Sequence, residues 1–420
     1  MADPPTLDSF LADAREWLDD HAERRTPDDD DEFVWGKGEL DVSVFHALSF
    51  DDERDLLERA KAWTQAKAER GYHAITWSPD VGGLGLPGAY ARAFGRLQSG
   101  YVLPTGHETH GVTTGLVAPT IQAFGTDEQR ADLVPRFLAA RELCCQLFSE
   151  PGAGSDLAAL GCRATLDGEE WVVDGQKVWS SGAQFSEWGL LIARSDPDVP
   201  KHKGLTAFVV PMDLPGIEVR PIKQMSGGSS FNEVFFDGAR VADAMRLGAL
   251  GDGWKVALTT LGFERDHSDS GGGGGRVGGS WRQLLGTAKA MGVTDDPIVR
   301  QRLVTLYTHH RVEQFTNRRA ADVRRAGQPA GPEGSLGKLL WTEGLTLMSD
   351  VVSAVLGAAL IAETGQWGTY EWGAHVLGAP GYRIAGGSDE VQRNIVGERV
   401  LGLPPEPRAD KDVAWKDVPR

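Results

Sequence analysis

The stretch between Gln146 and Ser181 contains residues whose types and spacing could bind a large anionic ligand. Its first part, residues 148–156, interleaves small residues with hydroxyl groups. Gly152 and Gly154 leave backbone N–H groups open to a bulky ligand, because glycine has no Cβ. Two serines add side-chain donors beside them, Ser149 and Ser155. By itself, this pattern also suits an ordinary glycine-rich loop that precedes a β-sheet.

Two Asp-Gly pairs mark the second part of this stretch. Apolar-rich runs flank both Asp167-Gly168 and Asp174-Gly175, and Asp-Gly between such runs is a strong hairpin signal. The sequence therefore predicts strands over residues 162–166, 171–173 and 177–180, joined by two tight turns. Trp179, Ser180 and Ser181 end the stretch with a flat aromatic face and two hydroxyls.

Charge and composition exclude several classes of function. A formal net charge of -17 and a pI near 5.1 argue against nucleic-acid binding. The three cysteines have neither a disulfide framework nor a metal-like spacing, so Cys144 and Cys145 are interpreted as strand or core residues. No secretory signal is evident, and no apolar run approaches the roughly 20 residues of a spanning helix. We therefore expect a soluble cytoplasmic enzyme with no metal site and no membrane or nucleic-acid partner.

The spacing of apolar residues divides the chain into three parts. Helical patterns prevail before residue 146, over 7–25, 51–70, 89–98, 112–124 and 127–139. Short β-rich runs at 188–193, 205–210 and 233–236 are separated by Gly, Pro and Asp, which predicts an antiparallel β domain. The helical period then returns over 254–262, 297–325, 334–364 and 390–397. We predict an α+β fold with domains at residues 1–145, 146–250 and 251–420.

A run of five glycines at residues 271–275 interrupts the C-terminal helical pattern, within 266–280. No Gly-Lys-Ser/Thr follows, so a phosphate-binding loop is excluded. Such a run is too costly in conformational entropy to become ordered by itself. A mobile lid near an active site and a tolerated surface loop are the two interpretations.

Taken together, these motifs resemble those of the acyl-CoA dehydrogenase family. The resemblance covers roughly residues 70–407 and is carried by five segments: 148–156, 174–181, 231–236, Phe263-Glu264-Arg265 and 384–404. It implies an N-terminal helical domain, a middle antiparallel β domain and a C-terminal four-helix bundle. It also implies an FAD-dependent enzyme that oxidises an acyl-CoA thioester to the trans-2-enoyl-CoA. The implied partners are an electron-transfer flavoprotein, as electron acceptor, and further copies of the chain in a homodimer or homotetramer.

The reaction of this family requires a carboxylate that removes the α-proton of the acyl group. Many members carry it in a C-terminal Tyr-Glu-Gly-Thr loop, but the matching residues here are Ala385-Gly386-Gly387-Ser388, and glycine accepts no proton. Members that resemble the isovaleryl- and long-chain enzymes carry it on a helix, immediately before an arginine. Glu264 and Arg265 match that position, although an isolated Glu-Arg pair is usually a surface feature. We expect Glu264 to be the base, with Glu390 and Glu398 as alternatives.

The resemblance also implies contacts to the cofactor and the substrate. Trp179 would lie against the isoalloxazine, and Ser181 would donate toward its N5. The backbone N–H of Gly386 would donate to the thioester oxygen. The remaining expected FAD contacts are Phe148, Ser149, Gly154, Ser155, Ser388 and Glu390, and the remaining expected substrate contacts are Ser155, Phe263, Arg265 and Gly387.

Two family elements that reach FAD depart from the usual pattern. The Arg-x-x-Phe element is poorly matched by Trp281-Arg282-Gln283-Leu284, and the Gln-x-x-Gly-Gly element keeps one glycine within residues 354–358. Two alternatives therefore stay open: a flavin-dependent monooxygenase or oxidase on the same fold, and a partner subunit of a hetero-oligomeric acyl-CoA dehydrogenase. Because Gly386 and Gly387 remove side-chain volume, we expect bulky, branched or ring-bearing acyl groups.

Overall fold

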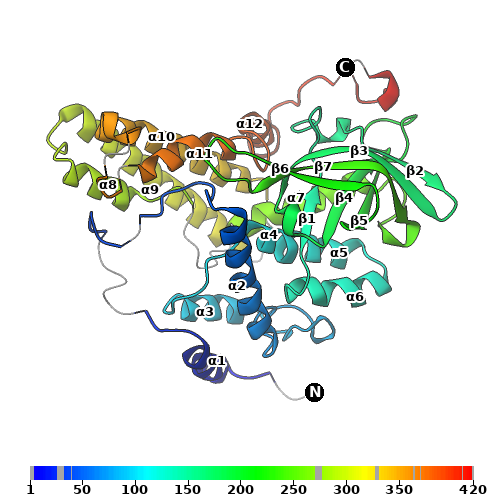
Figure 1. The fold of residues 1–420 in the computed structure, drawn as a ribbon, viewed down its shortest axis with the longest axis horizontal. Coiled ribbons are helices and arrows are strands. Elements are labelled where there is room, and N and C mark those ends of the chain that lie inside the picture. Colours follow the sequence, from blue (N-terminus) through cyan, green and yellow to red (C-terminus); the bar gives the residue numbers. More distant parts are fainter. Residues whose placement is uncertain are drawn as a thin grey trace.

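The fold was analysed in a computed structural model. It describes residues 4–25, 33–38, 40–269, 277–326, 331–362, 365–368, 370–408 and 410–418, without the side chains of residues 264–269 and 324–325. Helices occupy both ends of the chain and strands occupy its middle, as Figure 1 shows. The predicted α+β class, with a helical N-terminal part, a middle β-sheet and a helical C-terminal region, is confirmed.

The N-terminal helices lie on one side of the sheet, below it in Figure 1. Polar side chains start several of them: the hydroxyl of Thr6 caps α1, and Thr126 and Gln129 form a capping box at α6. A π-helical segment, Val112–Val117, joins α4 to α5, and such segments often occur at functional sites. The helices are α1 (Leu7–His21), α2 (Phe50–Ala68), α3 (Gly88–Gln98), α4 (Glu108–Gly111), α5 (Ala118–Phe124) and α6 (Asp127–Leu138).

The middle of the chain forms one sheet, in the order β6-β7-β3-β2-β4-β5-β8, with β1 paired to β4. Neighbouring strands of this sheet are antiparallel, as predicted. The exceptions are the parallel β1–β4 pair and a single parallel residue pair between β2 and β4. β4 and β5 are apolar and buried along nearly their whole length, which is typical of strands covered on both faces. The strands are β1 (Cys144–Leu147), β2 (Arg163–Asp167), β3 (Glu170–Ser181), β4 (Trp188–Arg194), β5 (Leu205–Pro211), β6 (Ile217–Ile222), β7 (Phe231–Ala242) and β8 (Arg246–Leu247).

The second predicted hairpin turn, at Asp174-Gly175, is wrong. β3 runs through both residues and pairs with β7 on either side of them, with a shift of register there. The Asp174 carboxylate accepts the N–H of Gly238 at 2.9 Å and so joins the strands instead of reversing the chain. Gly175 has a φ of 148°, which suits a β-bulge. The first pair, Asp167-Gly168, does form the predicted turn, between β2 and β3.

The C-terminal helices pack around α10, which contacts α7, α8, α9, α11 and α12. α8 and α11 were not predicted; α11 contains Pro380 and three glycines, which are poor helix formers. α7 continues beyond the predicted end at residue 262, so the chain is helical through Glu264 and Arg265. The helices are α7 (Gly253–Asp269), α8 (Trp281–Ala290), α9 (Pro297–Arg325), α10 (Gly334–Leu356), α11 (Glu371–Tyr382) and α12 (Asp389–Ile395).

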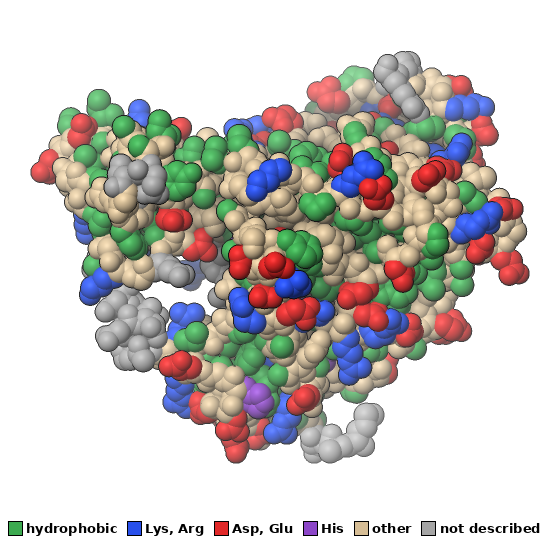
Figure 2. Space-filling view, viewed as in Figure 1, with side chains coloured by type: hydrophobic (Ala, Val, Ile, Leu, Met, Phe, Trp, Pro, Cys, Tyr) green, Lys and Arg blue, Asp and Glu red, His purple; other side chains and the backbone are tan. Residues whose placement is uncertain are grey.

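One segment, Gly334–Leu360, is long and apolar enough to cross a membrane by length and composition, contrary to our expectation from the sequence. The core helix of a soluble protein passes the same test, and α10 lies among five other helices. On the face shown in Figure 2, acidic and basic side chains are interspersed rather than gathered into a basic patch. These observations make the segment weak evidence for a membrane.

The bulge in β3 can be tested with a pair of glycine substitutions. A Cβ at Gly175 would lie 2.8 Å from the Cα of Cys162, whereas a Cβ at Gly168 would meet nothing within 4 Å. We expect Gly175→Ala to lower the free energy of unfolding by about 2–4 kcal/mol through strain and overlap. Gly168→Ala should lower the free energy of unfolding by only about 1 kcal/mol. Urea denaturation of both variants measures the difference, and equal losses would contradict the bulge.

Candidate functional site

A buried ammonium group holds the loop at residues 148–150 against β3. The side chain of Lys177 is fully buried, with its Nζ 2.7 Å from Oε1 of Glu150. The same Nζ donates to the carbonyl oxygens of Phe148 and Ile192, at 3.1 and 2.8 Å. The Glu150 carboxylate also accepts the N–H groups of Gly161 and Cys162, at 2.7 and 2.9 Å. Because buried charges require such complete pairing, these bonds fix the loop relative to the strand.

The two parts of the stretch between Gln146 and Ser181 are thereby brought together. The N–H of Val178 on β3 donates to the carbonyl of Ser149 at 2.9 Å, and Glu150 and Ala153 exchange N–H···O bonds of 3.0 Å across a tight turn. Beyond this turn Ser155 is exposed, and a Cβ at Gly152 or Gly154 would meet nothing within 4 Å. The loop therefore leaves space beside its backbone. The side chain of Phe148, in contrast, lies in the hydrophobic core.

Trp179 projects from β3 in a strained conformation. Its φ is +61° and its side chain is 59% exposed, although the neighbouring Ser180 is buried. A non-glycine residue in this region costs on the order of 1–3 kcal/mol and is found most often at functional sites. The indole lies edge to face with Phe231, at a centroid distance of 6.0 Å. An exposed flat ring beside an open glycine loop fits a stacked ring system, so these residues fit FAD.

Ser181 ends β3 against the N-terminal helices. Its hydroxyl donates to Oε1 of Glu108, the first residue of α4, at 3.1 Å. Desolvation by the surrounding atoms raises the pKa of Glu108. No role is predictable for Glu108 from the sequence, because nothing in its local sequence indicates that α4 meets the end of β3.

A line of aromatic rings connects Trp179 with the C-terminal loop. Beyond Phe231, the ring of Phe45 follows at 5.4 Å and stacks on Tyr382 at 4.9 Å. Tyr382 is the last residue of α11, directly before the loop. A Cβ at Gly381 would lie 2.6 Å from the Phe45 ring. The absence of a side chain at this position of α11 therefore leaves room for the ring. The rings thus join β7, the N-terminal segment and α11.

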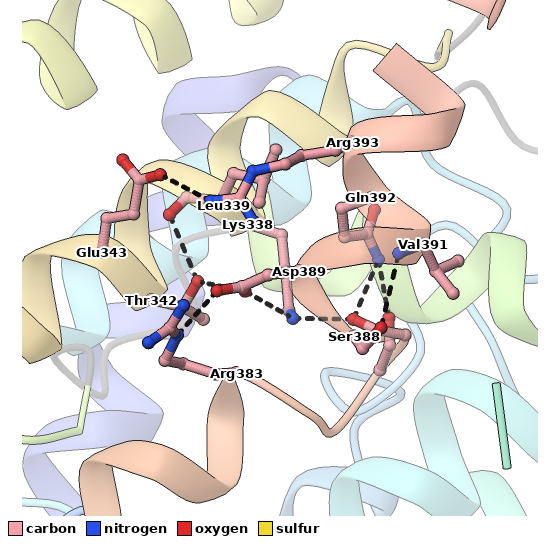
Figure 3. A network of polar contacts seen from close by, with 12 residues as sticks. Lys338, Leu339, Thr342, Glu343, Arg383, Ser388, Asp389, Val391, Gln392 and Arg393 are labelled. Carbon is pink, nitrogen blue, oxygen red and sulfur yellow. Dashed lines mark hydrogen bonds and ion pairs between the residues drawn. The ribbon is translucent and has the colours of Figure 1, made fainter. Parts of the chain in front are cut away.

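The C-terminal loop is fixed from behind by a network around Asp389, shown in Figure 3. Asp389 is buried and accepts bonds from Nε of Arg383 at 2.7 Å and Oγ1 of Thr342 at 3.0 Å. Although burial opposes ionisation, these donors lower the pKa of Asp389. The ammonium of Lys338 lies 3.7 Å from this carboxylate and donates to the carbonyl of Gly387 at 2.7 Å. No local pattern in the sequence indicated this network.

The two loop glycines have backbone conformations that disfavour other residues. Gly386 has a φ of 65° and Gly387 a φ of 90°. The amide of Gln392 donates to the carbonyl of Gly386 at 2.9 Å, and a Cβ at Gly387 would lie 2.8 Å from that amide nitrogen. The loop therefore keeps its shape with no side chain at the position where relatives of the predicted family carry a glutamate.

Ser388 and Glu390, predicted FAD contacts, lie at the start of α12. The hydroxyl of Ser388 caps the helix by accepting the N–H of Val391 at 3.4 Å. Glu390 is exposed in the first turn, where a backbone N–H and the Ser388 hydroxyl lower the pKa of its carboxyl. Both side chains therefore stabilise the helix start, and their contact with FAD stays a prediction.

The helix with the predicted base packs on the sheet and on α5. Thr260 of α7 lies 3.0 Å from Thr120, between their hydroxyl oxygens, and Phe263 is half-buried against the core. The side chains of Glu264 and Arg265 lie outside the described residues, as do residues 271–275. Their predicted roles, as base, substrate contact and lid or surface loop, therefore stay predictions.

The Lys177–Glu150 pair can be tested by removing the cation. Lys177→Met leaves the Glu150 carboxylate without its counter-charge, so we expect a loss of about 3–5 kcal/mol in the free energy of unfolding and weaker FAD retention. Lys416→Met breaks the exposed pair with Asp198 and should leave the free energy of unfolding nearly unchanged. Urea unfolding and the FAD-to-protein ratio measure both effects. Similar small losses in the two variants would refute the role of Lys177.

Comparison with known proteins covers all three parts of the chain. The family models that match are the acyl-CoA dehydrogenase N-terminal domain over residues 44–141, the middle domain over 145–239 and the C-terminal domain over 251–401. Acyl-CoA dehydrogenase IpdE1 of Mycobacterium tuberculosis is 38% identical over 357 residues, which cover 84% of this chain and 90% of the relative. The short-chain specific mitochondrial acyl-CoA dehydrogenase of Homo sapiens is 28% identical over 352 residues, which cover 79% of this chain and 80% of the relative.

Solved structures with this fold include two-component proteins. The Tcur3481-Tcur3483 steroid ACAD has a TM-score of 0.72 at 26% identity, with 96% of this chain and 99% of that chain covered. The ChsE4-ChsE5 complex from Mycobacterium tuberculosis has a TM-score of 0.68 at 24% identity, with 97% of this chain and 100% of that chain covered. At that identity the second likeness shows the fold alone.

Proposed function

Because the chain belongs to the acyl-CoA dehydrogenase family, whose members are FAD-dependent oxidoreductases, we propose that it oxidises a bulky, ring-bearing acyl-CoA to the trans-2-enoyl-CoA. The observation that carries this proposal is the exposed, strained Trp179 beside the open glycine loop that Lys177 holds in place. When bound, FAD supplies the two-electron acceptor. The residues of the chain supply its position, the thioester contacts and the base.

The roles of individual residues follow from the elements that carry them. Ser155, in the open loop, would contact the CoA or the pyrophosphate of FAD. The backbone of Gly386 would donate to the thioester oxygen, a task that requires no side chain. Since this loop carries no glutamate at that position, we assign removal of the α-proton to Glu264 on α7. The flanking Phe263 and Arg265 would line the substrate.

The size of the acyl group is the second part of this proposal. Gly386 has no side chain at the position where many other members of the family carry a carboxylate. One of the similar solved proteins, which shares 26% identity over nearly the whole chain, is named a steroid ACAD. Both observations support a ring-bearing substrate. An electron-transfer flavoprotein as electron acceptor, and a cytoplasmic location, belong to the same proposal.

A second candidate is a subunit that requires a homologous partner. Tcur3481-Tcur3483 and ChsE4-ChsE5 are each named for two different components, which favours a hetero-oligomer over the homodimer or homotetramer predicted from the sequence. The two candidates differ in what the chain does when it is purified alone. Stoichiometric FAD and turnover would support the first, and FAD binding that requires a co-expressed partner would support the second.

The assignment of the base is tested by Glu264→Gln. This change keeps the size of the side chain and removes its basicity, so we expect flavin reduction to slow by at least about 10²-fold. Ligand binding should persist, seen as perturbation of the flavin spectrum by substrate analogues. Glu58→Gln, on the exposed surface of α2, is the control and should reduce flavin at nearly the wild-type rate. If Glu264→Gln behaved like the control, Glu390 would become the candidate.

The size of the acyl group is tested with a panel of thioesters. We expect cyclohexanecarboxyl-CoA to exceed butyryl-CoA in kcat/KM by at least about tenfold, since each well-placed methylene contributes roughly 1–3 kcal/mol in an apolar pocket. Anaerobic bleaching of the flavin during titration identifies the substrates, and steady-state kinetics with an artificial acceptor rank them. Butyryl-CoA as the best member of the panel would refute the proposed size.

A further inference from the structure

A short C-terminal segment, residues 410–415, returns to the sheet after the last helices. Figure 1 shows the chain running from α12 back to the β domain. There the N–H of Trp415 donates to the carbonyl of Val199 at 2.9 Å, and Ala414 forms a β-bridge with Pro200. The segment is therefore bonded to the connection between β4 and β5.

The indole of Trp415 reaches past this connection to the loop that precedes β2. Its Nε1 donates to the carbonyl of Ala159 at 3.0 Å, and a Cβ at Gly161 would lie 3.5 Å from the ring. The N–H of Gly161 is bonded to the Glu150 carboxylate at 2.7 Å. Trp415 therefore packs on the same segment that Glu150 and Lys177 join to β3.

A buried cation strengthens this contact. The guanidinium of Arg194, on β4, lies 4.8 Å from the centroid of the Trp415 ring, and its side chain is among the most deeply buried of the protein. It donates to the carbonyls of Ala158 and Leu160, at 2.6 and 3.2 Å. Cation–π attraction is stronger when the cation is desolvated. Loss of the indole would admit water to the bonds that hold this loop.

An ion pair connects the same C-terminal segment with the end of the glycine-rich motif. Nζ of Lys201 lies 2.7 Å from Oδ2 of Asp156 and 2.6 Å from Oδ2 of Asp410. Asp156 directly follows Ser155, the exposed serine of the open loop. The side chain of Lys201 is only 12% exposed, so salt screens these pairs less than it screens pairs on the open surface.

From these contacts we propose that residues 410–415 position the open glycine loop for FAD, with Trp415 and Lys201 as the positioning residues. In the bonded arrangement, the residues after Ser155 already have one conformation. Without it, they would have to become ordered when FAD binds, and the free energy of that ordering lowers the affinity. The inference rests on the proposed function, which places FAD beside this loop.

The test removes the indole and measures FAD affinity. Dilution of the FAD-loaded full-length protein gives the dissociation constant through the recovery of flavin fluorescence. We expect Trp415→Ala to raise this constant by at least about fivefold. Trp415→Phe keeps an aromatic ring over Arg194 and loses the N–H bond to Ala159, so it should raise the constant by less.

The matched control is Trp188→Ala, at the opposite end of β4. The indole of Trp188 also donates through its N–H, to Glu142 at 2.6 Å, and also faces an arginine, Arg136 at 5.6 Å. This control should keep the wild-type dissociation constant, and urea unfolding of both variants separates a loss of stability from a loss of FAD. An unchanged constant in Trp415→Ala, or an equal increase in both variants, would overturn the inference.

Hydrogen exchange provides a readout that does not depend on the cofactor. In Trp415→Ala, the backbone N–H groups of residues 157–162 should exchange at least about tenfold faster than in the wild-type protein, whereas Trp188→Ala should leave them unchanged. If the wild-type protein took up no FAD, the proposed function would fail, and exchange would still decide whether the C-terminal segment holds the loop. Wild-type exchange rates in Trp415→Ala would refute that role.

Discussion

The ammonium group of Lys177 is enclosed by protein, and a charge in such a place is stable only when its protons find acceptors. Its acceptors come from the glycine loop and from β4, through Phe148, Glu150 and Ile192. Trp179 and Ser181 follow Lys177 on the same strand, so one bonded cation fixes the loop relative to the aromatic and hydroxyl side chains beside it. The C-terminal segment supports the far side of the same loop region, where the indole N–H of Trp415 donates to the carbonyl of Ala159 at 3.0 Å.

Residues with positive φ lie around this framework. Trp179, Gly386 and Gly387 have φ values of 61°, 65° and 90°, and they belong to the two segments that would meet the cofactor and the thioester. Glycine adopts this conformation without strain, whereas that of Trp179 persists only where the surroundings determine it. The bonds of Lys177 do so for the strand, and the Asp389 network with Gln392 does so for the loop. Both supports are polar and lie behind the site, which leaves these three residues themselves open to a ligand.

Much of the architecture was predictable because it depends on local patterns. The helix Pro297–Arg325 and the turn at Asp167-Gly168 follow from apolar spacing and turn chemistry alone. The hairpin at Asp174-Gly175 was predicted wrongly because pairing with β7, about 60 residues further along the chain, keeps both residues in one strand. Glu108 and Lys177 could not be assigned for the same reason. Their partners are 73 and 27 residues away in sequence, and no local pattern encodes such contacts.

The glycine at position 386 is best understood together with what surrounds it. The C-terminal loop derives its shape from Asp389, Lys338 and Gln392, which bond to one another's segments and to the loop carbonyls. None of these bonds involves a side chain at position 386, so the fold tolerates the loss of a carboxylate there without losing the loop. In the proposed function, substrate width and the transfer of the base to α7 are two consequences of this one change in the loop.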